Sequence, residues 1–401
     1  MTRRQFATVT GTALASPSVL SGADTAALDA TLRDGIAKRG IPAVVAMLSG
    51  LDKPLYSGAF GVRDSSGTHV TVDSIFSIAS MTKAITTVAA LQLVERDEIG
   101  LDDPVGKVLR ELARIPVVTG FDSMGEPILR PSKTPITLRH LLIHTSGLCY
   151  SRWDANAFRY AEKEGRPEAL MFDPGTRWQY GTGIDWAGRL VERLSGMTLE
   201  EYFQVNILRR LDMVDTSFLV PDSKFDRLVT GATRQPDGRL KELERKPPTV
   251  PKSFNGGGGL YSTVADYTKF MQMILGNGRG INTQQILQPK TVELLKTNQI
   301  GSLTAGKMKS FAPETSADVD IQPGHTEKWS LGFLLNTDAY DHGRSAGSMA
   351  WAGLFNTFYW IDPVKNVCGV LMMQFLPFVD KEAVGLLGDF ERAAYGLIRP
   401  F

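Results

Sequence analysis

The central segment of this chain reads Phe76-Ser-Ile-Ala-Ser-Met-Thr-Lys-Ala-Ile-Thr-Thr-Val-Ala-Ala-Leu-Gln-Leu-Val-Glu95. From Met81 to Val94 the apolar residues recur at helical spacing around most of the circumference, which predicts a helix buried in a core. Ser80 then lies at the N-terminus of this helix. Free backbone N–H groups and the helix dipole stabilise negative charge there, so the position suits an alkoxide or an oxyanion.

Lys83 follows Ser80 by one helical turn. Side chains at i and i+3 share a face, with Cβ atoms about 5–6 Å apart, so the lysine amine can reach the serine hydroxyl. An amine in an apolar surround loses its charge more readily and can then accept a proton. The pair predicts a serine nucleophile with a lysine base. The alternative is a helix-capping serine followed by a solvated lysine, because Ser-x-x-Lys arises by chance about once in a chain of this kind.

The composition indicates an ordinary globular protein, with 401 residues, 43% hydrophobic residues and a formal charge of +1. This length allows two subdomains that share a large core. No basic stripe favours nucleic acid as a partner, and no apolar run approaches the ~18 residues of a transmembrane helix. Cys149 and Cys368 match neither a metal motif nor a disulfide framework. The sequence sets no oligomeric state.

Residues 1–22 are expected to be a tail that precedes the folded chain. Arg3 and Arg4 lead into a mildly apolar stretch of small residues that ends near Leu20. This stretch is similar to a twin-arginine export signal, with Ala13-Leu14-Ala15 as a candidate cleavage site. The expected location is therefore the periplasm. A basic tail on a cytoplasmic protein is the alternative.

The remaining pattern predicts an α+β fold in which residues 23–75 and 251–401 form a sheet domain and residues 76–250 form an inserted, mainly helical subdomain. We expect an antiparallel sheet with helices at both ends of the chain, over 25–39 and 380–398, and the subdomain opposite them. Expected strands cover 41–48, 54–61, 328–336, 345–353, 357–361 and 367–374. Expected subdomain helices cover 101–109, 137–144, 185–194 and 199–208.

A second serine, Ser345, lies in a formal Gly-x-Ser-x-Gly motif, Gly343-Arg-Ser-Ala-Gly347. A nucleophile elbow of this kind needs a strand–turn–helix context and a histidine later in the chain. None of the five histidines follows Ser345, and the residues after it have a strand pattern. We therefore interpret the motif as an accident of a glycine-rich strand.

His140 and His144 are spaced four residues apart and could in principle share a metal ion. A zincin helix has glutamate directly after the first histidine, whereas this chain has Leu141. No other histidine or cysteine pattern supports a metal site. The sequence predicts two core or capping histidines and no metal.

Tyr180 is the candidate for the second proton-transfer group near Ser80. A tyrosine held near a lysine can shuttle a proton to a leaving group. The alternative is a ring that only packs beside Trp178. The glycine run over 255–260 lacks the Lys-Ser/Thr of a phosphate loop, and it predicts a backbone that passes close to another segment.

Five segments, in this order along the chain, resemble the serine β-lactamase and penicillin-binding superfamily, and within it the family VIII carboxylesterases and related class C β-lactamase-like hydrolases. The segments are Ser80-Met-Thr-Lys83, Leu138-Arg-His-Leu-Leu-Ile-His-Thr-Ser-Gly-Leu148, Pro174-Gly-Thr-Arg-Trp-Gln-Tyr180, Gly257-Gly-Gly-Leu-Tyr-Ser-Thr263 and Trp351-Ala-Gly353. The resemblance spans about residues 30 to 395. It implies the β-lactamase-like fold, an acyl-enzyme mechanism and no cofactor.

By this resemblance, Ser80 is the acylated nucleophile, Lys83 its base and Tyr180 the proton relay. The backbone N–H groups of Ser80 and Leu354 are expected to form the oxyanion hole. Thr182, Trp351 and Gly353 are expected to belong to the substrate pocket.

Two departures from the lactamase pattern bear on the substrate. Tyr-x-Asn is here Tyr180-Gly-Thr182, and Lys-Thr-Gly is here Trp351-Ala-Gly353. The second change removes a cation that would hold the carboxylate of a β-lactam. The resemblance therefore implies a serine esterase for small neutral acyl esters, with weak β-lactamase or penicillin-binding activity at most. Residues 180–192 are also similar to fungal acyltransferases that esterify a statin precursor, so acyl transfer to an alcohol is the alternative. A non-catalytic ligand-binding protein on the same fold is a remote one.

Overall fold

The computed structural model describes residues 20–163, 165–246 and 249–398, so the expected export signal lies outside the described residues. Its centre is an antiparallel sheet with the strand order β2-β1-β13-β12-β11-β10-β9. These strands are β1 (Ala43–Gly50), β2 (Pro54–Gly61), β9 (Glu327–Trp329), β10 (Leu334–Asn336), β11 (Met349–Gly353), β12 (Thr357–Asp362) and β13 (Val367–Met372). The predicted α+β class and antiparallel sheet are confirmed.

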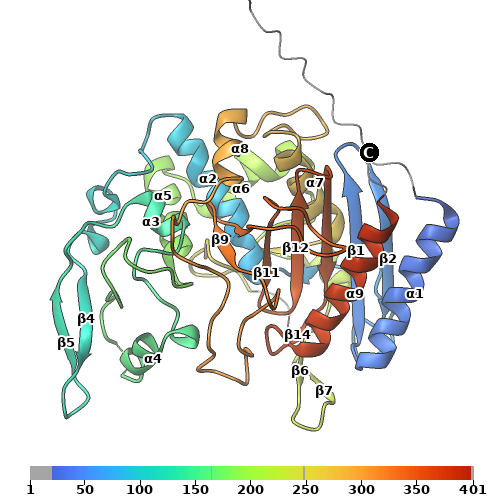
Figure 1. The fold of residues 1–401 in the computed structure, drawn as a ribbon, viewed down its shortest axis with the longest axis horizontal. Helices are drawn as coiled ribbons and strands as arrows, with labels where there is room; N and C mark the ends of the chain where they lie inside the picture. Colours follow the sequence, from blue (N-terminus) through green and yellow to red (C-terminus); the bar gives the residue numbers. More distant parts are fainter. Residues whose placement is uncertain (1–19, 164, 247–248, 399–401) are drawn as a thin grey trace, which may run out of the picture.

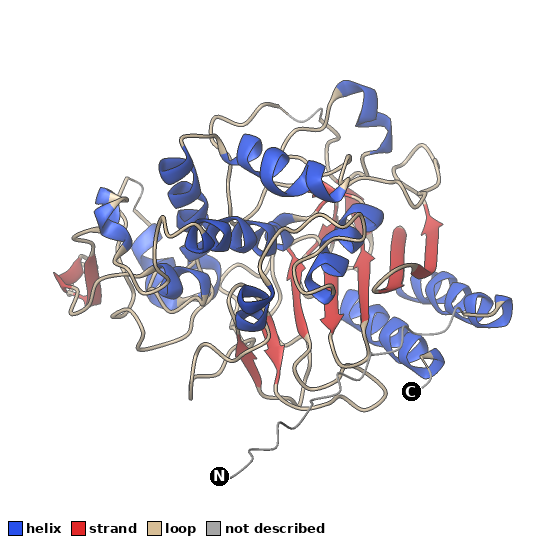
Figure 2. Ribbon diagram, turned by 90° about the horizontal axis from the view of Figure 1, so that it is seen from above, coloured by secondary structure: helices blue, strands red, loops and turns tan. Residues whose placement is uncertain are grey.

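Helices cover both faces of this sheet (Figures 1 and 2). They are α1 (Gly22–Arg39), α2 (Thr82–Glu95), α3 (Leu138–Leu142), α4 (Ala155–Ala161), α5 (Gly183–Ser195), α6 (Leu199–Phe203), α7 (Val264–Leu275), α8 (Pro289–Leu295) and α9 (Lys381–Leu397). Helices α1 and α9 lie side by side on one face, and α7 packs on β1, β12 and β13 from the other.

Strand β12 shows how the two layers are held. Successive side chains of a strand point to opposite faces. Trp360 packs against Phe390 of α9 with ring centroids 6.1 Å apart, and its neighbour Tyr359 packs against Tyr267 of α7 at 5.0 Å. Every residue of β12 is buried as a result.

Capping residues mark the ends of the two terminal helices. Ser21 caps α1 through a capping box with Asp24, and Gly40 ends the helix in the left-handed region at φ +57°. Asp380 caps α9 by accepting hydrogen bonds from two backbone N–H groups. The helices predicted over 25–39 and 380–398 are confirmed, although α1 begins three residues earlier than expected, at Gly22. Their ends are set by local sequence, through these capping residues.

Two strand predictions need correction. The strand expected over 328–336 is a hairpin of β9 and β10, because the chain reverses at Ser330–Phe333, where Gly332 adopts a φ of +81°. The strand expected over 345–353 begins only at Met349, because residues 345–348 form a turn.

Residues 76–250, which the sequence analysis assigns to a subdomain, depart further from expectation. The helix expected over 101–109 is wrong: only Val105–Lys107 forms a short 3-10 turn, which follows Pro104. The backbone of Gly106 lies so close to Ala113 that a Cβ at Gly106 would be 2.6 Å from the Ala113 Cα. The helix expected over 199–208 continues past Phe203 as a π-helical turn, Gln204–Leu208.

Several short strands lie outside the main sheet. β4 (Pro116–Phe121) and β5 (Pro127–Pro131) form a hairpin that projects from the subdomain at the left of Figure 1, and the sequence analysis missed it. β3 (Phe76–Ser77) pairs with β8 (Tyr261–Ser262). β14 (Phe375–Leu376), β6 (Ala232–Arg234) and β7 (Leu240–Glu242) form a third small sheet. The β3–β8 pair fixes the start of the Ser80 segment beside the end of the glycine run.

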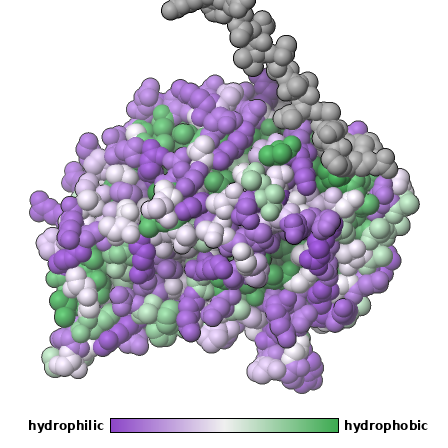
Figure 3. Space-filling model, in the orientation of Figure 1, coloured by the Kyte–Doolittle hydropathy of each residue, from purple (hydrophilic) through white to green (hydrophobic). Residues whose placement is uncertain are grey.

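The surface is mostly hydrophilic on the face shown in Figure 3, where apolar areas are small and separate. Among the described helices, none combines the length and the apolar character that crossing a membrane requires. Cys149 and Cys368 are both free thiols.

Candidate active site

Ser80 lies in a 3-10 turn, Ala79–Met81 (η1), that leads directly into α2. Twelve consecutive residues of α2, from Thr82 to Leu93, are buried, which confirms the predicted core helix. Ser80 itself stays partly exposed. The preceding residue, Ala79, has a φ of +42°, a backbone strain of the kind that gathers at functional sites.

Lys83 is fully buried and points its amine at Ser80. Its Nζ lies 3.3 Å from Ser80 Oγ, 3.1 Å from the Tyr150 hydroxyl and 2.5 Å from the carbonyl oxygen of Gly257. Three acceptors therefore surround one amine. A neutral amine has two N–H donors, so Gly257 and Tyr150 can take both and leave the lone pair directed at the Ser80 hydroxyl.

Tyr150 is a functional residue that the sequence analysis missed. Its hydroxyl accepts from Lys83 and donates to Asp185 Oδ2 at 2.8 Å. Burial, followed by the negative charge of Asp185, raises the pKa of Tyr150 well above its usual value. The hydroxyl therefore stays protonated and holds the amine in place. The one signal for Tyr150 in the sequence is its position, two residues after Leu148, where the second matching segment ends.

Tyr180 is buried beside the hydrogen bonds that join Lys83, Tyr150 and Asp185, and it lies on the loop that precedes α5. The Lys83 amine lies 4.9 Å from the centroid of its ring, and the Nε1–H of Trp351 donates to its hydroxyl at 3.0 Å. The structure thus brings Ser80, Lys83 and Tyr180 together. The direct hydrogen bond from Lys83 goes to Tyr150, however, and the Tyr180 hydroxyl is held by Trp351 from β11.

The glycine run passes close to other segments, as the sequence predicted, and in the structure these carry Asp185 and Lys83. A Cβ at Gly257 would overlap the carboxylate of Asp185, so only glycine allows the Gly257 carbonyl to reach Lys83. Asn255 Oδ1 accepts from the Gly257 N–H at 2.8 Å and steadies this turn.

The end of β11 forms the opposite side of the site. A Cβ at Gly353 would collide with the carbonyl of Ile78, so the end of the strand lies directly against the Ser80 turn. Leu354, the next residue, lines the same cavity as Ser80. This placement is compatible with an oxyanion hole made by the backbone N–H groups of Ser80 and Leu354.

The active-site cavity has a volume of about 340 Å³. The described residues that line it do not include Thr182 or Gly353, two of the expected pocket residues. Thr182 instead precedes the first residue of α5, and the Gly353 backbone packs on Ile78. The lining consists of Ser77, Ala79, Ser80, Tyr150, Arg152, Trp153, Tyr180, Asn255, Gly258, Gly259, Trp351, Ala352, Leu354 and Phe378.

Both histidines of the His140–His144 pair have structural roles. His140 closes a capping box with Thr137 at the start of α3. His144 is buried, its ring lies 4.6 Å from that of Tyr180, and its Nδ1 accepts from the Gly181 N–H at 3.4 Å. Burial and the nearby charge of Lys83 hold the pKa of His144 well below its usual value, so it is neutral. Within the described residues, no three His, Cys, Asp or Glu side chains are grouped to hold a metal.

Ser345 is not among the residues that line the cavity at Ser80. It is nearly buried in the turn before β11, and its backbone N–H donates to Asp362 Oδ2 at 2.9 Å. A strand rather than a helix follows it, so the context of a nucleophile elbow is missing.

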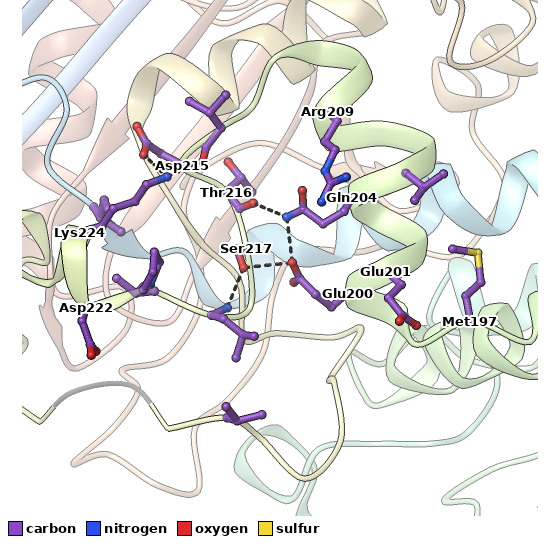
Figure 4. A pocket seen from close by; sticks show the side chains of 17 residues that line it. Met197, Glu200, Glu201, Gln204, Arg209, Asp215, Thr216, Ser217, Asp222 and Lys224 are labelled. Carbon is purple, nitrogen blue, oxygen red and sulfur yellow. Dashed lines mark hydrogen bonds and ion pairs between the residues drawn. The ribbon is translucent and has the colours of Figure 1, made fainter.

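A larger cavity, of about 810 Å³, lies between the π-helical turn after α6 and the segment 214–224 (Figure 4). Several of its polar groups are bound to each other. Glu200 accepts from Gln204 at 2.8 Å and from Ser217 at 3.1 Å, and Asp215 pairs with Lys224 at 2.8 Å. No activated nucleophile is present among its lining residues, so the smaller cavity at Ser80 is the candidate active site.

Comparison with known proteins agrees with this geometry. The sequence profile of the Beta-lactamase family matches residues 28–391. The chain belongs to the Beta-lactamase family. The resemblance inferred from the five segments is therefore confirmed for the family and for the β-lactamase-like fold.

Among curated relatives in this family, monacolin J acid methylbutanoyltransferase from Aspergillus terreus is 31% identical over 396 residues, which cover 92% of this chain and 95% of the relative. Lovastatin esterase from Penicillium rubens is 31% identical over 347 residues, which cover 80% of this chain and 84% of the relative. An acyltransferase and an esterase thus occur at the same level of similarity.

Solved structures give the same picture. Unliganded simvastatin synthase from Aspergillus terreus matches with a TM-score of 0.82 and 29% identity. The match covers 95% of this chain and 100% of the synthase. EstCE1, a hydrolase with promiscuous acyltransferase activity, matches with a TM-score of 0.71 at 21% identity over 94% of this chain and 100% of its own, and this likeness supports the fold alone. The chain is an enzyme of the serine hydrolase and acyltransferase type.

Proposed function

We propose that this protein is a serine esterase that cleaves short-chain acyl esters through an acyl-enzyme on Ser80. The observation that carries the proposal is the buried Lys83 amine, which lies 3.3 Å from Ser80 Oγ at the wall of an open cavity. A lysine is desolvated in this way when it serves as a base for a nearby nucleophile.

Acylation begins with transfer of the Ser80 proton to Lys83. Gly257 and Tyr150 accept the two N–H bonds of the neutral amine, so its lone pair faces the serine hydroxyl. The Ser80 oxygen then attacks the ester carbonyl. The negative charge that develops on the carbonyl oxygen is placed at the start of α2, where the Ser80 and Leu354 N–H groups and the helix dipole stabilise it.

Tyr180 is the proposed proton relay to the leaving alcohol. Its hydroxyl oxygen accepts from Trp351 Nε1 at 3.0 Å, and this bond orients the hydroxyl and stabilises the phenolate while its proton is away. In this proposal the Ser80 proton on Lys83 later restores the Tyr180 hydroxyl; the Lys83 amine lies 4.9 Å from the centroid of the Tyr180 ring. Water then attacks the acyl-enzyme with the same groups acting in reverse.

Transfer of the acyl group to an alcohol is the second candidate function. It needs no further residue, because an alcohol replaces water in the deacylation step. The chain is 31% identical both to a methylbutanoyltransferase and to an esterase. This similarity supports both fates of the acyl-enzyme, which are transfer to an alcohol and hydrolysis. The ratio of transfer to hydrolysis of p-nitrophenyl butyrate, measured over a series of added alcohols, separates them.

The test of the main proposal is turnover of p-nitrophenyl butyrate by wild type and by Ser80→Ala. Wild type should show turnover and gain the mass of one butyryl group on the peptide that holds Ser80. Equal rates for wild type and Ser80→Ala, or a butyryl adduct on another residue, would contradict the proposal. Nitrocefin tests the β-lactamase alternative, and we expect little hydrolysis because the apolar Trp351 stands where lactamases have a lysine.

A further inference from the structure

A cationic side chain lines the active-site cavity without taking part in the proposed chemistry. Arg152 belongs to the 3-10 turn Ser151–Trp153 (η4) and shares the cavity with Ser80 and Tyr180. Its guanidinium carbon lies 5.3 Å from the centroid of the Trp153 ring, and that ring lies 5.4 Å from Tyr180. One aromatic ring therefore separates the guanidinium from the proposed proton relay.

The charge of Arg152 has no carboxylate partner among the described residues. Its Nε donates to Thr315 Oγ1 at 2.9 Å, a neutral acceptor. Two other arginines of this region do have carboxylate partners: Arg166 pairs with Glu126, and Arg177 pairs with Asp154. Burial lowers the pKa of Arg152 by more than Tyr150, the exposed Glu314 and Tyr180 raise it. An arginine nonetheless stays protonated at neutral pH.

The cavity around this cation is otherwise largely apolar. Trp153, Trp351, Leu354 and Phe378 form much of its wall. In a binding site of this type, a few polar groups fix the orientation of the ligand, and partial desolvation strengthens their electrostatic interactions. Because the hydrogen bond to Thr315 uses only the Nε of Arg152, the two terminal nitrogens of the guanidinium can bind an incoming group.

We propose that Arg152 binds a carboxylate carried by the substrate, and that the enzyme prefers esters with such a group. A guanidinium offers two parallel N–H donors that match the two oxygens of a carboxylate. This inference rests on the proposed function and narrows its substrate class. It differs from the expectation of neutral esters, which came from the absence of a lysine at position 351, because Arg152 of η4 brings a cation to the same cavity.

The test uses two pairs of esters that differ in one negative charge. In the first pair the acyl group carries the carboxylate: mono-p-nitrophenyl glutarate against p-nitrophenyl pentanoate. In the second pair the alcohol carries it: 4-acetoxybenzoate against its methyl ester. For each protein, kcat/KM of the charged ester is divided by kcat/KM of the neutral ester, so a variant that folds poorly does not change the ratio.

Arg152→Gln should lower this ratio about 10- to 100-fold in one pair, and that pair identifies the side of the ester that carries the carboxylate. Arg152→Lys should keep part of the preference, because it retains the charge but loses the planar fork. Arg159→Gln is the matched control. Arg159 lies on α4, and its guanidinium stacks over the ring of Phe121 at 4.3 Å. It does not line the cavity, so the ratios of the Arg159→Gln variant should equal those of wild type.

Ratios for Arg152→Gln within about twofold of wild type in both pairs would overturn the inference. Wild-type turnover of the neutral esters would show in that case that the proposed esterase function still stands. Failure of wild type to exceed Ser80→Ala on all four esters is a different result, which overturns the proposed function and this inference with it.

Discussion

Replacement of Tyr150 by phenylalanine tests whether the hydroxyl between Lys83 and Asp185 positions the base. The change removes one oxygen atom from a chain in which Lys83 donates at 3.1 Å and the hydroxyl donates onward to Asp185 at 2.8 Å. The amine keeps its bond to Gly257 but can then rotate away from Ser80. Because the ring stays, its packing at 5.9 Å from Trp153 is retained.

The size of the effect follows from the bonds that are lost. A hydrogen bond to a charged group contributes about 1.5–3 kcal/mol, and loss of that amount from the transition state lowers kcat/KM about 10- to 150-fold. A proton relay contributes more, about 100- to 10,000-fold. We therefore expect Tyr150→Phe to be impaired and Tyr180→Phe to be impaired further.

The assay is kcat/KM for p-nitrophenyl butyrate, with the rate of the acylation burst measured separately. Tyr160→Phe is the control, because it removes a hydroxyl bound to the Pro167 carbonyl at 3.0 Å outside the cavity. A Tyr150→Phe rate within about twofold of wild type would refute the positioning role. A rate below that of Tyr180→Phe would refute the assignment of the relay, which would then belong to Tyr150.

Three further results are expected. Trp351→Phe removes the N–H that holds the Tyr180 hydroxyl, so steady-state kinetics should show kcat about 10-fold lower and KM little changed. Burial raises the pKa of Glu327 from 4.5 to about 7, so its protonated form favours the folded state; this contribution is full below pH 4.5 and is lost as the pH rises through 7. Urea unfolding at pH 5 and pH 8 should show that Glu327→Gln lacks this loss, which is up to about 3 kcal/mol, and equal pH slopes would contradict it. Ser345→Ala should retain ester turnover within about twofold, and loss of acylation in a folded variant would restore the nucleophile elbow.

The parts of the fold that could be predicted from the sequence are those set by local signals. Ser21, Gly40 and Asp380 act on their own helix ends, and the long apolar pattern of α2 is visible without any tertiary contact. The β4–β5 hairpin could not be predicted, because prolines at the ends of both strands argue against a strand unless it lies at an exposed edge. The failed helix over 101–109 depends on close approach of Gly106 to Ala113, a contact that periodicity does not report.

The same distinction divides the candidate site. Ser80 and Lys83 share one helical turn, so their encounter follows from spacing alone. Tyr150 and Gly257 bind the Lys83 amine from two other segments, and Asp185, on a third, accepts a hydrogen bond from Tyr150. Gly257 connects them: its missing side chain makes room for the Asp185 carboxylate, and its carbonyl binds the amine that Asp185 steadies through Tyr150. A side chain at this position would overlap the Asp185 carboxylate and disturb its hydrogen bond from Tyr150. The buried base therefore depends on a glycine far along the chain from Ser80, and this dependence becomes visible only when the β3–β8 pair brings the two segments together.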